Sequence, residues 1–167
     1  LTGYQDSSLH NIRQLINDAE IYINPLANPD GAYYGGNSTV QNARRYNANA
    51  IDLNRNFPDP KDGNHPDGNA WQQETVYMMQ YAEDRHFTLA ANFHGGAEVV
   101  NYPWDTWTHP TADDAWWEYV AREYASGVQD NSPAGYFDGF NNGITIGYEW
   151  YIINGGRQDY MNYFHQC

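Results

Sequence analysis

A short polar run between Asn49 and Phe57 carries residue types suited to binding a carboxylate. Asp52, Asn54 and Arg55 lie within four consecutive positions of this run, and apolar residues flank them. A planar guanidinium can donate two parallel hydrogen bonds to one carboxylate, and a neighbouring amide is a further donor. We therefore expect Asn54 and Arg55 to form a receptor for a carboxylate group.

The composition describes one acidic globular unit. The chain has 167 residues, 41% of them apolar, which is enough to bury one core. Eight Lys and Arg against 21 Asp and Glu give a formal net charge of −13, which argues against nucleic acid and anionic membranes as partners. The acid surplus suits a cationic peptide, or simply a well-solvated surface. No apolar run approaches the roughly 20 residues of a membrane span.

Helix and strand patterns alternate along the chain. Apolar spacing predicts helices over 6–16, 74–84 and 111–129, the last capped by Thr111, and strands over 21–25, 88–93 and 98–102. The composition between 28 and 69 predicts a long ordered loop. The strand over 88–93 delivers His94 at its carboxyl end, where ligands collect in open α/β sheets. The alternation predicts one α/β unit, with a mixed, mostly parallel sheet and helices on both faces.

Three parts of the sequence, in this order, resemble the zinc carboxypeptidases of peptidase family M14, with features of the N/E-like subfamily. They are Asn28–Gly31, Asn49–Phe57, and Phe93–Gly96 followed by Asn101–Asp105. The resemblance runs over nearly the whole chain. It implies that residues 1–167 are the central part of a single zinc carboxypeptidase-like catalytic domain, truncated at both ends, so that the sheet is incomplete.

The resemblance identifies His94 as a zinc ligand, although a lone histidine after a strand is on general grounds more often structural or exposed. A hydrolytic zinc site needs three protein ligands and an open position for water. In the family the other two ligands form a His-x-x-Glu pair, and a late glutamate is the catalytic base. This sequence contains no His-x-x-Glu. We therefore expect Zn²⁺ to bind in the complete domain, with the missing groups upstream of Leu1 and beyond Cys167, and these 167 residues alone to be inactive.

The same resemblance assigns substrate roles to the polar run. Arg55 with Asn54 would clamp the C-terminal carboxylate of a peptide. Arg45 would polarise the scissile carbonyl and stabilise its oxyanion, although its neighbour Arg44 makes this assignment ambiguous by one residue. Asp52 would orient the first zinc-binding histidine by a hydrogen bond. Without that histidine, we expect Asp52 to lack a partner and to be neutralised or solvated.

Three further residues are implied around the last side chain of the substrate. Tyr151 matches a mobile tyrosine that closes over bound substrate, and the alternative is a core aromatic. Asp105 and Gln158 fall where the subfamily shapes its pocket for the C-terminal side chain. A carboxylate there favours Lys or Arg, because a desolvated cation needs a partner. The alternative for Asp105 is an ordinary turn aspartate.

These assignments predict a metallocarboxypeptidase that removes the C-terminal residue, Lys or Arg, from a peptide or protein by means of zinc-activated water. A non-catalytic peptide- or carboxylate-binding fragment, or an inactive homologue, would use the same clamp. An amidase acting on cell-wall or glutamyl peptides would share the scaffold. The family resemblance favours a secreted or periplasmic location, and the exposed edges of an incomplete sheet favour self-association.

Overall fold

Two short parallel strands lie at the centre of the fold in the computed structural model, which describes residues 12–167. β1 (Val100–Tyr102) and β2 (Ile144–Ile146) pair with Val100 opposite Ile144. The connection between them contains α4 (Asp114–Asp130) and α5 (Gly139–Gly143), the kind of crossover that parallel strands require. The prediction of an α/β fold is therefore confirmed, and the sheet of the described residues is parallel.

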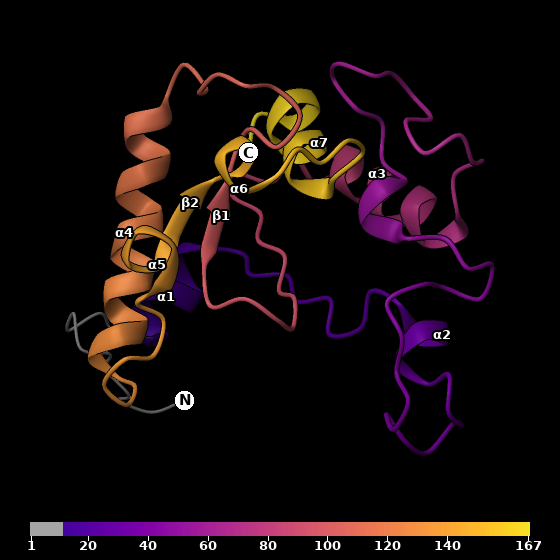
Figure 1. Cartoon of the computed structure of the whole chain (residues 1–167), viewed down its shortest axis with the longest axis horizontal. Coiled ribbons are helices and arrows are strands. Elements are labelled where there is room, and N and C mark those ends of the chain that lie inside the picture. Colours follow the sequence, from indigo (N-terminus) through magenta and orange to yellow (C-terminus); the bar gives the residue numbers. More distant parts are fainter. Residues whose placement is uncertain (1–11) are drawn as a thin grey trace.

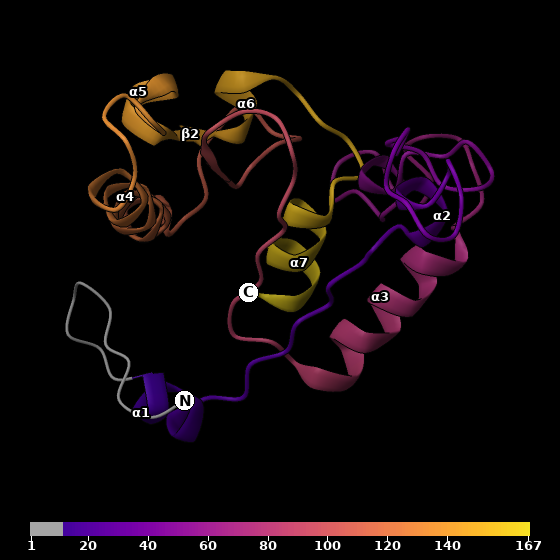
Figure 2. The same cartoon turned by 90° about the horizontal axis from the view of Figure 1, so that it is seen from below.

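Helices flank the strands on both sides. α4 lies on one side of β1 and β2, and α7 (Arg157–His165), backed by α3 (Gln73–Arg85), lies on the other (Figures 1 and 2). The remaining helical elements are α1 (Ile12–Asp18), α2 (Pro29–Ala32), the 3₁₀ turn η1 (Leu53–Arg55) and α6 (Gly147–Trp150). None of the helices between residues 12 and 167 has the length and apolar character that crossing a lipid bilayer demands.

Two apolar clusters hold this arrangement together. The first joins α4 to the strands and consists of Tyr102, Ala121, Ala125, Ile144 and Ile146. The second joins α3 to α7 and consists of Phe57, Ala82, Tyr160, Met161 and Cys167. Burial of such apolar surface is the main favourable contribution to folding, so these clusters fix the segments that carry the polar residues of interest.

The inner face of α4 explains how closely this helix approaches the strands. Ala121 and Ala125 are four residues apart, so they share one face of the helix, and both are buried. Their small side chains leave room for the strands, whereas Trp116 and Tyr119 are exposed. The predicted helix over 111–129 is thus present.

The boundaries of other predicted elements differ from expectation. The helix over 74–84 is confirmed as α3, and the strand over 98–102 is confirmed in a shorter form as β1. Thr111 does not cap α4, which begins at Asp114, because Thr111 is buried three residues before the helix. Residues 6–11 of the first predicted helix lie outside the described residues, and α1 continues from Ile12 to Asp18.

The strands predicted over 21–25 and 88–93 are wrong for the described structure. Both segments lack strand pairing, and Ile23 and Phe93 are 82% and 83% exposed. An apolar run shows that a segment is able to pair, but a strand forms only where a neighbour supplies hydrogen bonds. Neither segment has such a neighbour among residues 12–167. The loop predicted over 28–69 is ordered mainly by turns, with only α2 and η1 as helical pieces.

Candidate functional site

An ion pair organises the polar run identified from the sequence. The Nε of Arg45 lies 2.6 Å from Oδ2 of Asp52. The other oxygen of Asp52 accepts a hydrogen bond from the backbone N–H of Asn54 at 3.0 Å and so caps η1, which carries Arg55. Asp52 was expected to lack a partner in the absence of a zinc-binding histidine. That expectation is wrong, because Arg45 takes the place of the missing partner.

The two neighbouring arginines have different surroundings. The guanidinium of Arg44 stacks on the ring of Tyr34 at 3.8 Å and donates to the carbonyl of Asn47 at 3.1 Å. These contacts use Arg44 to fold its own loop. The charge of Arg45, by contrast, acts on His94. The arrangement favours Arg45 over Arg44 as the residue that faces the site.

Asn47 is the buried anchor of the arginine-bearing loop. It is 1% exposed, and its Oδ1 accepts hydrogen bonds from the backbone N–H groups of Asn49 and Ile51, both at 3.0 Å. Its Nδ2 donates to Oε1 of Gln72, immediately before α3, at 3.0 Å. Buried polar groups that are satisfied in this way specify one backbone path. Sequence reasoning missed Asn47 as an anchor, because an asparagine in a polar loop has no distinctive pattern.

The clamp residues Asn54 and Arg55 are joined to the N-terminus of α7. Oδ1 of Asn54 accepts the backbone N–H of Arg157 at 2.9 Å, and the N–H of Phe57 donates to the carbonyl of Gly155 at 3.1 Å. A Cβ at Gly155 would lie 2.3 Å from the carbonyl oxygen of Arg55, and the φ of Gly155 is +70°. Only glycine permits this approach without strain.

His94 lies within electrostatic reach of the same residues. Its side chain is exposed, and its pKa is lowered by partial desolvation and by the positive charges of Arg45 and Arg55, whereas Asp52 raises it. His94 therefore lies close enough to Arg45, Asp52 and Arg55 to be affected by their charges. A lowered pKa keeps the imidazole neutral, which is the form that ligates a metal.

The described residues do not supply a complete zinc site. Between residues 12 and 167, no three side chains of His, Cys, Asp or Glu gather as a metal-binding group. His94 is the single predicted ligand within this range, and one imidazole falls short of the three protein ligands of a hydrolytic site. We therefore derive no catalytic step through zinc from these residues.

Asp105 lies in a buried niche rather than in an exposed turn. It is 2% exposed, and its Oδ1 accepts a hydrogen bond from Nδ2 of Asn101 at 2.9 Å. A Cβ on Gly147 would lie 1.9 Å from that oxygen, so glycine leaves the space that the carboxylate fills. Burial raises the pKa of Asp105 to about 6, and the positive charge of Arg55 opposes this. The charge of Arg55 thus acts on both Asp105 and His94.

A second buried acid, Asp159, stands behind Asp105 and was missed from the sequence. It is 0% exposed, and its carboxylate accepts the backbone N–H groups of Asp105 and Thr106. Burial, and then the negative charge of Asp105, raise the pKa of Asp159 to about 7, while the two N–H donors lower it. An aspartate in a helical pattern is usually exposed, so only its tertiary contacts reveal it.

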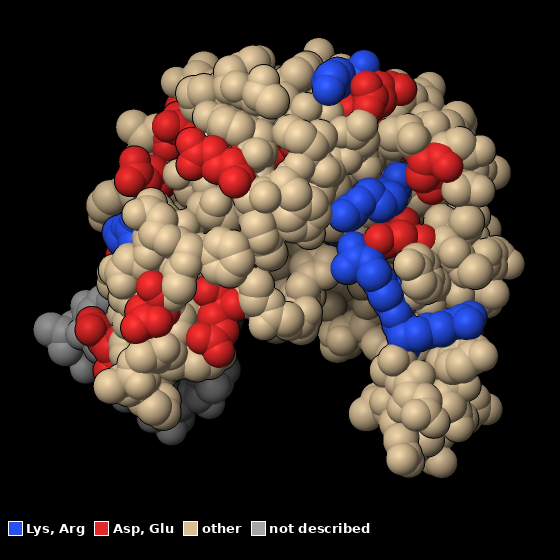
Figure 3. Space-filling model, in the orientation of Figure 1, with Lys and Arg blue, Asp and Glu red and all other residues tan. Residues whose placement is uncertain are grey.

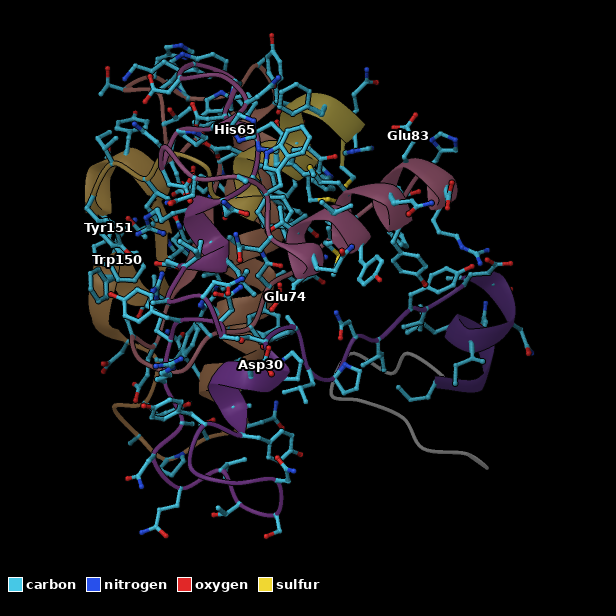
Figure 4. The ribbon with its side chains drawn as sticks, turned by 90° about the vertical axis from the view of Figure 1, so that its right-hand side faces the viewer. Asp30, His65, Glu74, Glu83, Trp150 and Tyr151 are labelled. Atoms are coloured by element: carbon cyan, nitrogen blue, oxygen red, sulfur yellow. The ribbon has the colours of Figure 1, made fainter. Side chains whose placement is uncertain are left out.

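Tyr151 and Gln158, the other two residues predicted around the substrate side chain, differ in exposure. Tyr151 is 44% exposed, and its ring lies edge-on to Trp150 at 4.9 Å (Figure 4), whereas Tyr160 is a core aromatic. The core alternative therefore does not describe Tyr151. The Nε2 of Gln158 is buried without a hydrogen-bond partner among the described residues. A donor left free in this way is available to a ligand.

Positive charge is concentrated around these loops, although the chain is acidic overall. Figure 3 shows Lys and Arg side chains mainly on the right-hand half of the face, with several Asp and Glu side chains beside them, whereas the charged groups on the half that contains α4 are mostly Asp and Glu. A local positive field in an acidic protein attracts anionic groups to one place. This distribution suits the binding of a peptide carboxylate.

Replacement of Asp105 by asparagine tests its burial through pH dependence. Because its pKa is raised in the folded state, Asp105 keeps its proton at pH values where the unfolded chain has released it. The protonation of Asp105 therefore stabilises the fold fully below about pH 4, and this stabilisation is lost as the pH rises through about 6. The difference in the pKa of Asp105 between the folded and unfolded states corresponds to roughly 3 kcal/mol of unfolding free energy. We expect the unfolding free energy of Asp105→Asn to fall less between pH 4 and 7 than that of the wild type in urea titrations. The exposed control Asp130→Asn should follow the wild type, and equal slopes for all three proteins would contradict burial of Asp105.

Comparison with known proteins identifies the family of the chain. Residues 1–167 match the family described as zinc carboxypeptidase, peptidase family M14. Carboxypeptidase M of Mus musculus is 36% identical over 93% of this chain and 38% of its own length. The carboxypeptidase N catalytic chain of Mus musculus is 38% identical over 92% of this chain and 41% of its own length. Carboxypeptidase D of Drosophila melanogaster is 34% identical over 95% of this chain and 12% of its own length. The chain spans less than half the length of these relatives. It belongs to the zinc carboxypeptidase family.

Proposed function

We propose that this chain holds the C-terminal residue of a peptide or protein for removal by a zinc carboxypeptidase, with Lys or Arg as the preferred residue. The position of Arg55 is the observation that supports this most directly. Its charge acts on both His94, the predicted metal ligand, and Asp105, the predicted pocket carboxylate. A carboxylate receptor between these two groups would place the last peptide bond near His94 and the last side chain near Asp105.

Each polar residue has a distinct task in this proposal. Arg55 and Asn54 bind the terminal carboxylate, and Nδ2 of Asn54 is the donor that remains after its Oδ1 has accepted the N–H of Arg157. Arg45 faces the carbonyl of the scissile bond and stabilises negative charge on its oxygen. Tyr151 covers the bound residue from the exposed side.

The pocket for the last side chain consists of Asp105 and Gln158. Burial raises the pKa of the Asp105 carboxyl, and the hydrogen bond from Asn101 and the charge of Arg55 oppose this only in part. A bound Lys or Arg would supply a cation and favour the charged form. The buried Nε2 of Gln158, which has no hydrogen-bond partner among the described residues, is a donor for an oxygen of the bound peptide and not for the cation itself.

A non-catalytic role for the 167 residues has its own support. The described residues provide only His94 of the expected zinc ligands. We therefore propose that residues 1–167 bind the peptide without cleaving it, and that hydrolysis and stable zinc binding belong to a complete domain. The location we propose, secreted or periplasmic, rests on family membership alone.

Self-association is a further part of the proposal. The unpaired segments 21–25 and 88–93 expose Ile23 and Phe93 almost fully. Apolar segments with free backbone groups tend to pair with other chains. Sedimentation velocity should then show oligomers that grow with concentration, and a strictly monomeric chain at high concentration would count against this part.

Calorimetric titration with an N-acylated dipeptide ending in Arg tests the clamp. We expect Arg55→Lys to weaken binding by about tenfold, because an ammonium cannot donate the parallel pair of hydrogen bonds. The dipeptide amide, which lacks the carboxylate, should bind weakly and equally to both proteins. Arg44→Lys is the matched control and should bind as the wild type does. The peptide should be recovered uncut, and cleavage by residues 1–167 would contradict the non-catalytic role.

Exchange of the C-terminal residue tests the pocket. Asp105→Asn should weaken binding of the Arg-ending dipeptide by about tenfold or more, because the cation loses its charged partner. Binding of the Phe-ending dipeptide should change little. Asp130→Asn, which alters an exposed acid, should leave both affinities unchanged. An undiminished preference for Arg in Asp105→Asn would refute the role of this carboxylate.

A further inference from the structure

We propose that Asp159 is a positioning residue for specificity, which holds the backbone at Asp105 so that the Asp105 side chain meets the last side chain of the bound peptide. This inference rests on the proposed function. Asp159 does not itself touch the peptide in this account. Its effect passes through the segment that carries Asp105.

The contacts of Asp159 are directed at that segment. Both oxygens of its carboxylate lie 3.0 Å from the backbone N of Asp105, and Oδ2 lies 2.8 Å from the backbone N of Thr106. Hydrogen bonds from N–H groups to a buried carboxylate are stronger than those to a neutral acceptor. Asp159 also lies in the first turn of α7, where the helix dipole favours a negative charge. The segment is thereby tied to a helix that the apolar core holds in place.

Hydrogen bonds from other parts of the chain also hold residues 104–106 in place. Oγ1 of Thr106 donates to Oδ1 of Asp59 at 3.0 Å, and the N–H of Ile153 donates to the carbonyl of Asp105 at 3.2 Å. The N–H of Tyr148 donates to the carbonyl of Trp104 at 2.8 Å. Both backbone groups of Asp105, the N–H of Thr106 and the carbonyl of Trp104 therefore have hydrogen-bond partners. Its carboxylate is left to interact with Asn101 and with a ligand.

Substitution of Asp159 by asparagine disturbs the hydrogen bonds that hold the backbone at Asp105. An asparagine side chain has one acceptor oxygen, and its amide group would turn a donor toward backbone N–H groups that need acceptors. If the amide oxygen takes the place of Oδ2, which lies near both N–H groups, the amide nitrogen takes the place of Oδ1 and faces the N–H of Asp105, so that two donors oppose each other and the segment shifts. A shift of the Asp105 carboxylate weakens its contact with a cationic side chain, but it leaves the carboxylate clamp at Arg55 intact.

The ratio of two affinities tests this proposal in the full chain. Calorimetry gives the dissociation constants of N-acylated dipeptides ending in Arg and in Phe. We expect Asp159→Asn to lower the preference for Arg at least fivefold, mainly by weakening the Arg-ending peptide. In the Asp105→Asn background the same change should have no further effect on the ratio, because the two residues act through one contact.

Thr75→Val is the matched control for loss of a buried hydrogen bond. Thr75 is 1% exposed, donates to Oδ1 of Asn56 at 3.0 Å and has no contact with Asp105 among the hydrogen bonds of the described residues. The Thr75→Val variant should have a lower melting temperature but the same ratio of affinities for the Arg-ending and Phe-ending dipeptides. If Asp159→Asn does not fold, Asp159→Glu serves instead, because it keeps both acceptors but displaces them by one methylene, and its ratio should also fall.

The possible results separate this inference from the proposed function. A wild-type chain without preference for Arg would overturn the proposed pocket, whatever Asp159 does. A wild-type preference for Arg that survives unchanged in Asp159→Asn, or in Asp159→Glu where that variant is used, would overturn the positioning role alone. A fall in the ratio with Thr75→Val as well would show that general destabilisation is the cause, and this would also overturn it.

Discussion

The close approach of two backbone segments at Gly155 is the constraint on which the rest of the site depends. A side chain at this position would collide with the carbonyl of Arg55, so its absence lets the arginine-bearing turn lie directly against the chain that enters α7. The hydrogen bonds from Phe57 to Gly155 and from Arg157 to Asn54 then fix the register between them. From this junction α7 places Asp159, and Asp159 holds Asp105.

Buried carboxylates are the second organising feature of the molecule. Asp59, Asp105 and Asp159 are each at most 2% exposed, which is costly for ionisable groups unless hydrogen bonds or charges compensate. Asp59 and Asp159 are compensated by donors, several of them backbone N–H groups, and they connect loops distant in sequence. Asp105 has only the amide of Asn101 among the described side chains. This difference distinguishes a carboxylate that holds the structure from one that is able to receive a ligand.

The elements that could be predicted are those in which local pattern and tertiary packing agree. α3, α4 and β1 follow from apolar spacing, and each packs against a neighbour. The segments over 21–25 and 88–93 have equally clear apolar patterns but no pairing partner in residues 12–167, so they remain extended and exposed. An apolar sequence pattern indicates that a segment can be buried, but burial also requires a neighbouring segment against which it packs.

The residue types and their order by themselves determined the family, and they predicted Asn54 and Arg55 as carboxylate-binding residues. These conclusions require only the identity and order of the residues, which the amino-acid sequence gives directly. Tertiary structure alone decided that Arg45 pairs with Asp52, that Asp105 is buried rather than in an exposed turn, and that Asp159 supports it. Asp105 and Asp159 are 54 positions apart in the sequence, and no local pattern encodes a contact that forms only when the backbone has folded.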